Sequence, residues 1–348
     1  MAELQTTFIT GSLRLPLNPA SASSAPGDGY LWFDTGSNQV IISKLEFGGG
    51  QPAGPGGAVW TTAAFMNNAR RSLGTAGNST SAVAFGGYRS PGTVTNFTEE
   101  YNGTSWTNVS AMSVSRRDLG GFGTQNAALG FTGATPANQN RTEEYNGSSW
   151  STGGSYPNSQ QSSQGTGTQN SGLSVGGFPS TYDNCTKEYN GSSWSNGGNT
   201  SINRYTSAVT GTQNSGLTFG GQNPATIVST EEYNGSSWST GGNMSQPRMG
   251  HGGAGTQNDS IAMVGYNNTT SISHATSELY NGSTWSTTTS ANVRRCRVGS
   301  DGSAGNGILV GGAQRTPVCL YYSCTELFTS GPGTPATPNT SSIVNINL

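Results

Sequence analysis

The sequence predicts an all-β fold in which units of short strands repeat about every 44 residues, and two observations support this prediction. The triplet Tyr-Asn-Gly occurs at steps of 44, 44, 44 and 47 residues, starting at Tyr101, Tyr145, Tyr189, Tyr233 and Tyr280. A tryptophan stands five residues after each of these tyrosines. A period in this range, built from short apolar runs and glycine turns, is typical of a β-propeller, whose blades stack around an axis.

One unit of the repeat contains four predicted strands. Arg248 to Gly255 is small and glycine-rich, as the crowded centre of a ring requires, and a Gly-Thr-Gln-Asn turn follows. Ser260 to Gly265 is an apolar second strand, and Thr276 to Tyr280 is the third. Asn281-Gly282 predicts a two-residue hairpin turn, because Asn and Gly tolerate positive φ angles best. Ser283 to Ser286 is the fourth strand and carries the tryptophan.

Counting these strands predicts six blades. The fourth strands carry six tryptophans, which are Trp60, Trp106, Trp150, Trp194, Trp238 and Trp285. The third strands end at the five repeat tyrosines and at Phe328. Trp60 has no first three strands before it, and Phe328 has no fourth strand after it. We therefore expect the N-terminal strand around Trp60 to complete the last blade and to cover its open edge.

The repeat resembles the kelch repeat: a strand led by arginine, a double glycine, then Glu-x-Tyr and a tryptophan. The double glycine ends the second strand at Gly86-Gly87, Gly176-Gly177, Gly220-Gly221 and Gly311-Gly312. The resemblance covers about three quarters of the chain. It implies a propeller fold and no particular activity, because this fold carries enzymes and binding modules alike.

Composition predicts four regions: an N-terminal assembly module (1–47), a glycine-rich linker (48–57), the propeller (58–328) and an extended C-terminal arm (329–348). A Pro/Ala/Ser linker followed by Gly27-Asp-Gly-Tyr-Leu-Trp-Phe-Asp34 and the apolar strand Gln39 to Ser43 resembles small modules of tailed-bacteriophage fibre and virion proteins. That resemblance implies anchoring to other virion proteins. The final Ile343 to Leu348 can either pair with a strand of a neighbour or be a frayed end.

The bulk composition argues against several partners. A net charge of −2, with 9% charged residues, gives no electrostatic reason to expect nucleic acid or an anionic membrane. No apolar run of about 18 residues is present, and Met1 to Gly11 lacks the pattern of a secretory signal. We expect a virion protein made in the host cytoplasm, without cofactor or metal, although a link between Cys319 and Cys324 is conceivable.

A glutamate stands two residues before the third-strand aromatic in five units, at Glu99, Glu143, Glu231, Glu278 and Glu326, with Lys187 in the remaining one. Such a ring of acids could bind cations. A residue demanded by nearly every blade is better explained as structural, bonded to backbone or to an arginine such as Arg117, Arg204 or Arg248.

Residues that break the symmetry of the repeat are few. His251 and His274 are expected to be satisfied or solvated, and no copper-ligand set like that of kelch-fold oxidases can be assigned. Gly147-Ser-Ser-Trp150 matches the end of the sialidase Asp box, but Tyr145 stands at the aspartate position. We therefore predict no catalytic residues. The alternatives are a polysaccharide-degrading propeller enzyme, which would need blade-specific acids such as Asp183 and Asp301, and an intracellular kelch adaptor.

Ring closure by the N-terminal strand would place both tails on the face of the short turns. The opposite face would then display the loops that differ between blades. The predicted binding residues in these loops are Tyr88, Arg89, Phe178, Tyr182, Asp183, Tyr266, Arg315, Tyr321 and Tyr322. Tyrosine and arginine suit sugar or protein recognition, although each can also pack within its loop. We expect a non-enzymatic tail fibre, appendage or capsid decoration protein, present in several copies, that attaches to a host-surface glycan or protein.

Overall fold

The computed structural model describes residues 31–34, 39–42, 57–90, 92–315 and 320–330. The chain divides into two compact units, residues 1–49 with 335–348, and residues 50–334. In the first unit, β1 (Leu31–Asp34) pairs antiparallel with β2 (Gln39–Ile42). The rest of the predicted assembly module and the predicted C-terminal arm from residue 331 onward lie outside the described residues. No membrane-spanning helix occurs in the part of the chain that the structure describes.

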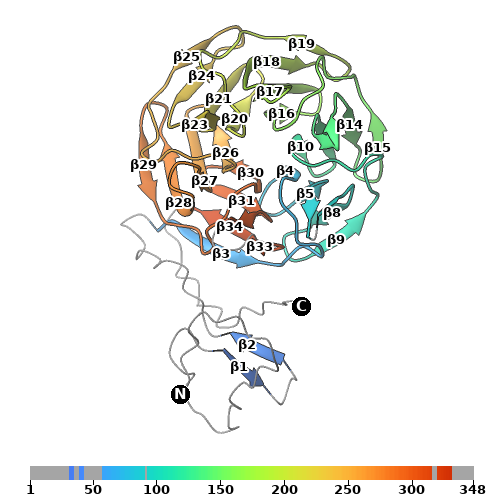
Figure 1. Cartoon of the computed structure of the whole chain (residues 1–348), viewed down its shortest axis with the longest axis vertical. Coiled ribbons are helices and arrows are strands. Elements are labelled where there is room, and N and C mark those ends of the chain that lie inside the picture. Colours follow the sequence, from blue (N-terminus) through green and yellow to red (C-terminus); the bar gives the residue numbers. More distant parts are fainter. Residues whose placement is uncertain (1–30, 35–38, 43–56, 91, 316–319, 331–348) are drawn as a thin grey trace. The chain divides into compact units, whose positions relative to one another are not determined.

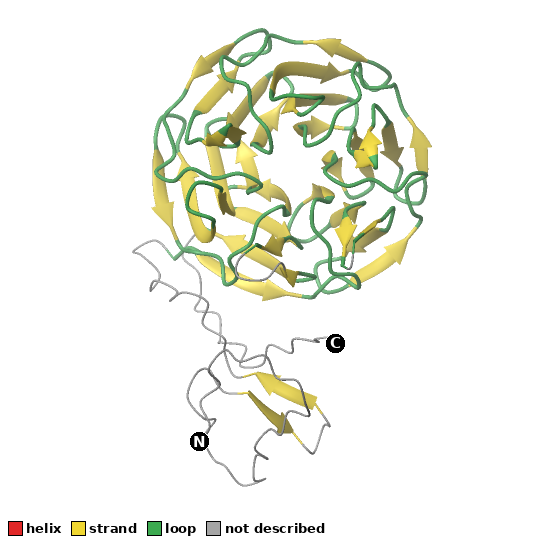
Figure 2. Ribbon diagram, viewed as in Figure 1, coloured by secondary structure: helices red, strands yellow, loops and turns green. Residues whose placement is uncertain are grey.

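The second unit is a closed ring of six blades, each an antiparallel sheet of four strands (Figures 1 and 2). Blade 1 consists of β4 (Gly74–Gly77), β5 (Ala82–Phe85), β8 (Thr98–Tyr101) and β9 (Trp106–Val109). Blade 2 consists of β10 (Gly120–Thr124), β11 (Ala127–Phe131), β14 (Thr142–Tyr145) and β15 (Trp150–Thr152). Blade 3 consists of β16 (Gln164–Thr168), β17 (Ser171–Gly177), β18 (Asp183–Tyr189) and β19 (Trp194–Asn196).

The other three blades repeat this order. Blade 4 consists of β20 (Ala208–Thr212), β21 (Ser215–Phe219), β24 (Thr230–Tyr233) and β25 (Trp238–Thr240). Blade 5 consists of β26 (Gly252–Thr256), β27 (Asp259–Asn267), β28 (Ile272–Tyr280) and β29 (Trp285–Thr288). Blade 6 consists of β30 (Gly299–Ser303), β31 (Asn306–Val310), β34 (Thr325–Thr329) and β3 (Val59–Ala63). The predicted six-bladed all-β propeller is confirmed.

The N-terminal strand closes the ring as predicted. In blade 6, β3 pairs antiparallel with β34, so that Trp60 lies opposite Phe328 and Val59 opposite Thr329. The Trp60 indole also donates a hydrogen bond to the Thr289 carbonyl, 3.1 Å away at the end of blade 5. Because Val59 and Thr329 are neighbours, the chain enters and leaves the ring at the same edge.

That edge belongs to the face formed by the short turns within each blade, which we call the hairpin face. The Ser330 N–H donates to the Gly305 carbonyl, in the turn between β30 and β31, at 3.0 Å. The opposite face, called the loop face, carries the connections from second to third strand and from blade to blade. The described ends of the propeller therefore both lie on the hairpin face.

The repeated residues join each blade to the one before it. The tryptophan indole donates to a threonine hydroxyl of the preceding blade, as Trp194 does to Thr142 at 2.9 Å. The glutamine of the Gly-Thr-Gln-Asn turn donates to two carbonyls of the preceding blade, as Gln169 does to those of Ala128 and Tyr145. The tryptophan occurs in all six blades, and the glutamine occurs in blades 2 to 5, as Gln125, Gln169, Gln213 and Gln257. Each gives a buried polar group its partner across a blade boundary.

A tyrosine–glutamate bond also crosses four of the blade boundaries. The Tyr189 hydroxyl donates to the Glu144 carboxylate of the preceding blade at 2.6 Å. Between blades 5 and 6 both partners change together, since Phe328 has no hydroxyl and Leu279 has no carboxylate. Between blades 6 and 1 only the glutamate is replaced, by Leu327, and the Tyr101 hydroxyl donates instead to the Gly103 carbonyl at 2.8 Å.

The repeated glutamates pair with buried arginines, which supports their structural interpretation. The pairs are Arg70–Glu99, Arg116–Glu143, Arg204–Glu231, Arg248–Glu278 and Arg295–Glu326. The prediction that Arg117 is such a partner is wrong: the buried Arg116 pairs with Glu143, and the neighbouring Arg117 pairs with Asp118. In blade 3, Gln160 replaces the arginine and Lys187 replaces the glutamate. The Gln160 amide donates to the Ser163 hydroxyl, and Lys187 Nζ donates to the Asn196 side-chain oxygen.

Two local predictions need correction. The Asn-Gly turns are four-residue loops, in which Tyr101 pairs with Trp106 and only Gly103 has a positive φ, of 91°. Asn102 itself has no positive φ angle. Its side-chain oxygen accepts hydrogen bonds from the Thr104 and Ser105 N–H groups. The first strands also begin later than predicted, at Gly252 in blade 5, because the preceding Gly250 adopts a left-handed φ of 56°.

Candidate binding face

The connections from second to third strand differ from blade to blade, as predicted. Four blades add a small hairpin on the loop face: β6 (Tyr88–Arg89) with β7 (Thr93–Val94), β12 (Ala134–Thr135) with β13 (Ala137–Asn138), β22 (Gln222–Asn223) with β23 (Ala225–Thr226), and β32 (Ala313–Gln314) with β33 (Leu320–Tyr321). Blades 3 and 5 instead prolong their own strands past a shift in register. All nine predicted binding residues lie in these connections.

The loops are held against the centre of the ring by an isolated bridge in each blade. The residue after the buried arginine pairs with the residue after the glycines, as Arg71 does with Tyr88 and Tyr205 does with Gln222. In blade 5, Met249 pairs with Tyr266 in the same way. Sequence reasoning missed this inner ring of residues. The signal for it is positional, since each member directly follows the arginine of the repeat, or Gln160 in blade 3.

Tyr88 and Tyr321, which belong to neighbouring blades, lie together on the loop face. Their ring centroids are 6.1 Å apart. The Arg71 guanidinium lies 5.0 Å from the Tyr88 ring centroid and 5.4 Å from that of Tyr321. The Arg117 guanidinium lies 5.8 Å from the Tyr88 ring centroid. These distances are those of cation–π contacts, which fix the arginine planes beside the tyrosines.

A second group consists of Phe178, Tyr182 and Tyr205. The Phe178 ring lies 5.7 Å from Tyr182 and 5.3 Å from Tyr205, both edge to face. Tyr205 was not predicted, because it comes from the connection between blades and not from the loop after the glycines. This aromatic group lies in blades 3 and 4, whereas the tyrosine–arginine group lies at blades 6, 1 and 2.

The remaining predicted residues mainly support their own loops. Arg89 lies over the Phe97 ring at 5.1 Å, and the Tyr322 hydroxyl donates to the Gln314 side chain at 2.9 Å. The Asp183 carboxylate accepts from the Cys185 N–H at 3.1 Å. Tyr266 is buried, and the exposed Arg315 covers its ring at 4.7 Å. The structure thus brings the nine residues to one face in separate groups, and their role in binding stays a prediction.

Six left-handed residues surround the central axis at the loop face. Each stands two positions after the buried arginine or Gln160, with φ between 53° and 58°, and they are Ser72, Asp118, Ser162, Thr206, Gly250 and Arg297. Backbone hydrogen bonds join neighbouring members, as from the Asp118 N–H to the Ser72 carbonyl at 2.9 Å. This ring defines the mouth of the central channel.

Asp118 and Arg297 break the symmetry of that mouth. The Arg297 guanidinium donates to one Asp118 oxygen at 2.9 Å, and Arg117 pairs with the other oxygen. Burial by itself would raise the pKa of Asp118, but the charges of Arg297, Arg117 and Arg71 outweigh it and hold this pKa below its ordinary value. Asp118 is therefore an ionised carboxylate with arginines on both sides.

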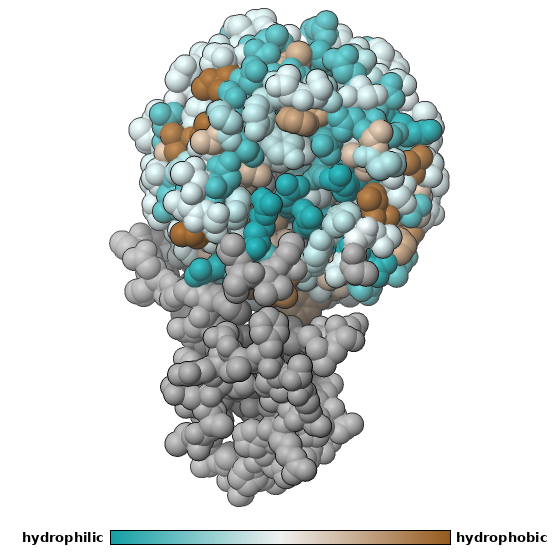
Figure 3. All heavy atoms as spheres, in the orientation of Figure 1, coloured by the Kyte–Doolittle hydropathy of each residue, from teal (hydrophilic) through white to brown (hydrophobic). Residues whose placement is uncertain are grey.

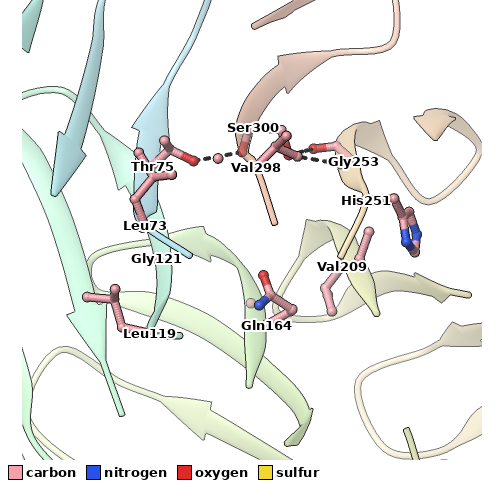
Figure 4. A pocket seen from close by; sticks show the side chains of 14 residues that line it. Leu73, Thr75, Leu119, Gly121, Gln164, Val209, His251, Gly253, Val298 and Ser300 are labelled. Carbon is pink, nitrogen blue, oxygen red and sulfur yellow. Dashed lines mark hydrogen bonds between the residues drawn. The ribbon is translucent and has the colours of Figure 1, made fainter. Parts of the chain in front are cut away.

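The channel continues inward as a small cavity between the first strands (Figure 4). Its volume of about 40 Å³ is lined by Thr75, Gln164, Val209, His251 and Ser300, among others. That volume suffices for roughly three water molecules, at about 10–15 Å³ each. Burial lowers the pKa of His251 to about 3, so this imidazole is neutral, and its two nitrogens have no partner within the described residues.

The two acids named for the enzyme alternative lie in different parts of the ring. Asp301 is in the inner strand β30 of blade 6, where its carboxylate accepts from the Gly77 N–H at 2.9 Å. Burial without a neighbouring cation raises its pKa to about 7. Asp183 starts β18 on the loop face of blade 3. Each carboxylate bonds to backbone, and the fold does not bring the two together.

The half-buried His274 lies in β28, where burial lowers its pKa to about 4. Three or more His, Cys, Asp or Glu side chains do not gather as a metal site anywhere in the described ranges. Cys324 is buried, is not in a disulfide and precedes β34, while Cys319 lies outside the described residues. Comparison of the chain with models of known protein families and with curated proteins gave no match.

Proposed function

We propose that this protein is a non-enzymatic adhesion or decoration protein of a tailed-phage virion, which uses the loop face of its propeller to bind a glycan or protein on a host surface. The observation that carries the proposal is that both ends of the propeller lie on the same face of the ring. Val59 and Thr329, where the chain enters and leaves the propeller, are paired on the hairpin face. The opposite face is left for display.

The chemistry of the two faces supports this division. Five third-to-fourth-strand turns of the hairpin face start with Asn-Gly followed by two Ser or Thr residues, and they are bonded by their own asparagine side chains. The loop face carries a different connection in every blade, with tyrosine, phenylalanine and arginine side chains in separate groups. Recognition requires such differences, because a surface repeated six times cannot distinguish the parts of an asymmetric ligand.

The assignment to a virion rests on the sequence before the propeller. The Gly27-to-Asp34 motif after a Pro/Ala/Ser linker resembles modules of phage fibre and virion proteins, and the kelch-like repeat adds a fold that often serves recognition. Anchoring through the predicted terminal segments, residues 1–47 and 329–348, with several copies per particle, completes the proposal.

Two measurements test the proposal. Immunogold electron microscopy with antibody against the propeller should label intact particles, and the labelled full-length chain should bind cells of some strains in a panel of bacteria. Tyr182→Ala with Arg315→Ala, on the loop face, should weaken cell binding. Ser148→Ala with Ser192→Ala, in exposed turns of the hairpin face, is the matched control and should not.

Three results would overturn the proposal. The first is a chain that is absent from particles. The second is loss of cell binding only in the hairpin-face variant. The third is release of sugars from bacterial polysaccharide by the purified chain, which would favour the enzyme alternative.

A further inference from the structure

Four charged side chains gather at the mouth of the channel. Arg71, Arg117 and Arg297 surround a single carboxylate, Asp118. The whole chain has only 15 basic and 17 acidic residues, with a net charge of −2. The group therefore carries about two positive charges on a protein that is otherwise nearly neutral. In Figure 3, hydrophilic side chains gather around the centre of the disc.

Asp118 acts as the fixed centre of this group. Its carboxylate is buried, and its two oxygens are taken by Arg297 and by Arg117. A carboxylate held by two guanidinium groups fixes their planes, so that their remaining N–H groups point in set directions. Asp118 thus organises the cations without neutralising all of them.

Arg71 is the cation that this carboxylate does not hold directly. It lies over the rings of Tyr88 and Tyr321, and no carboxylate within residues 57–90, 92–315 and 320–330 forms an ion pair with it. The Tyr88 ring has the Arg117 guanidinium close to it as well. Two arginines beside one tyrosine, with a second tyrosine adjacent, provide a fork for an anion next to two aromatic surfaces.

We propose that Arg71, Arg117, Tyr88 and Tyr321 form a subsite for an acidic sugar, with the sugar carboxylate bound by the two arginines and the pyranose ring beside the tyrosines. This inference rests on the proposed function and names the ligand class of the loop face. Guanidinium groups match the geometry of a carboxylate, and tyrosine combines an apolar ring with a hydroxyl. A neutral glycan would leave the two excess positive charges without a partner.

This chemistry predicts how binding depends on the solution. The arginines stay charged at any ordinary pH, and the low pKa of Asp118 keeps its carboxylate ionised. Binding should therefore be constant from about pH 6 to pH 9, and salt should weaken it because the site is open to solvent.

The test uses the full-length chain and three soluble polymers. Polygalacturonate carries one carboxylate per sugar, its methyl ester is the matched neutral polymer, and poly(glycerol phosphate) offers an anion without a sugar ring. Isothermal titration should show binding to polygalacturonate that is at least tenfold tighter than to either of the others. Equal binding of the methyl ester, or preference for the phosphate polymer, would overturn the proposal.

Variants locate the site. Arg71→Gln with Arg117→Gln should weaken polygalacturonate binding tenfold or more, and Arg71→Lys should weaken it by less, since the charge remains while the fork is lost. Arg141→Gln with Arg294→Gln removes the same charge outside the subsite and outside the nine predicted binding residues, and it should leave polygalacturonate binding unchanged. Equal losses in the two double variants would refute the location. Circular dichroism and melting temperature show that each variant is folded.

Cell binding separates this inference from the proposed function. If the wild-type chain binds cells and Arg71→Gln with Arg117→Gln binds them equally well, the loop face still serves attachment and the acidic-sugar subsite is wrong. If the wild-type chain binds no cells in the panel and labels no particles, the proposed function fails, whatever polygalacturonate binding shows. Parallel loss of polymer and cell binding in the same variant would support both.

Discussion

The buried pair Arg204–Glu231 allows a quantitative test of why the repeat demands a glutamate. Both side chains are almost completely buried, with 0% and 3% exposure. Glu231 also accepts from the Ser201 N–H and hydroxyl, both at 2.7 Å. Glu231→Gln keeps the shape and one acceptor oxygen, but it leaves the guanidinium without a counter-charge. Removing one partner of such a pair costs about 3–5 kcal/mol.

The assay is thermal unfolding followed by circular dichroism. For a domain of this size, about 1 kcal/mol corresponds to roughly 2–4 °C, so Glu231→Gln should lower the melting temperature by about 10 °C. The matched control is Glu232→Gln, the same substitution at the next residue, where the carboxylate only accepts from the Tyr280 hydroxyl. It should cost about 1 kcal/mol.

A double variant completes the cycle. Arg204→Met combined with Glu231→Gln removes both charges and should recover a good part of the loss, as replacement of whole buried ion pairs often does. Loss of less than about 3 °C in Glu231→Gln, or an equal loss in the control, would refute the reasoning, because the recurrence of glutamate would then have another cause.

Three further predictions test the ring and its seam. A chain that starts at Met66 lacks β3 and exposes the outer edge of β34, so it should associate edge to edge, and a monomer in light scattering would contradict the closure argument. Tyr189→Phe should cost about 1–2 kcal/mol by leaving Glu144 unpaired, and adding Glu144→Leu, which copies the Leu279–Phe328 pair, should restore part of it in urea unfolding. Asp301 keeps its proton up to about pH 7 in the folded state but ionises near pH 3.8 when unfolded, so its contribution to stability is present below pH 3.8 and is lost as pH rises to 7. Between pH 4 and pH 8, the free energy of unfolding of Asp301→Asn should therefore rise by up to about 4 kcal/mol relative to that of the wild type. A difference between the two that does not change with pH would contradict the burial argument.

The predictions that succeeded concern contacts made in every blade. A side chain that links neighbouring blades must recur at the period of the repeat, so Trp194 or Gln169 can be recognised from sequence spacing. The role of Trp60 followed from counting, since six tryptophans and six third strands leave one strand to close the ring. The Glu231–Arg204 pairing was also accessible, because both residues recur at fixed offsets.

The predictions that failed concern choices between adjacent residues. Arg116 and Arg117 are indistinguishable by type, and only the path of the backbone before β10 decides which one is buried. The Asn-Gly turn was predicted as a two-residue turn and is a four-residue loop. The hydrogen bonds that the Asn102 side-chain oxygen accepts from the Thr104 and Ser105 N–H groups form only in the folded loop. Sequence period says little about such single positions.

The amino-acid sequence by itself determined the number of blades, the strand that completes the last one and the face from which both ends leave, because these depend on a repeat that each neighbouring pair of blades enforces. The channel mouth was decided only by the tertiary structure. Asp118 and Arg297 are 179 residues apart and belong to blades 2 and 6, with blade 1 between them, so no local pattern joins them. Closure of the ring alone brings them within hydrogen-bond distance and, with Arg71 and Arg117, makes one side of a nearly symmetric disc cationic.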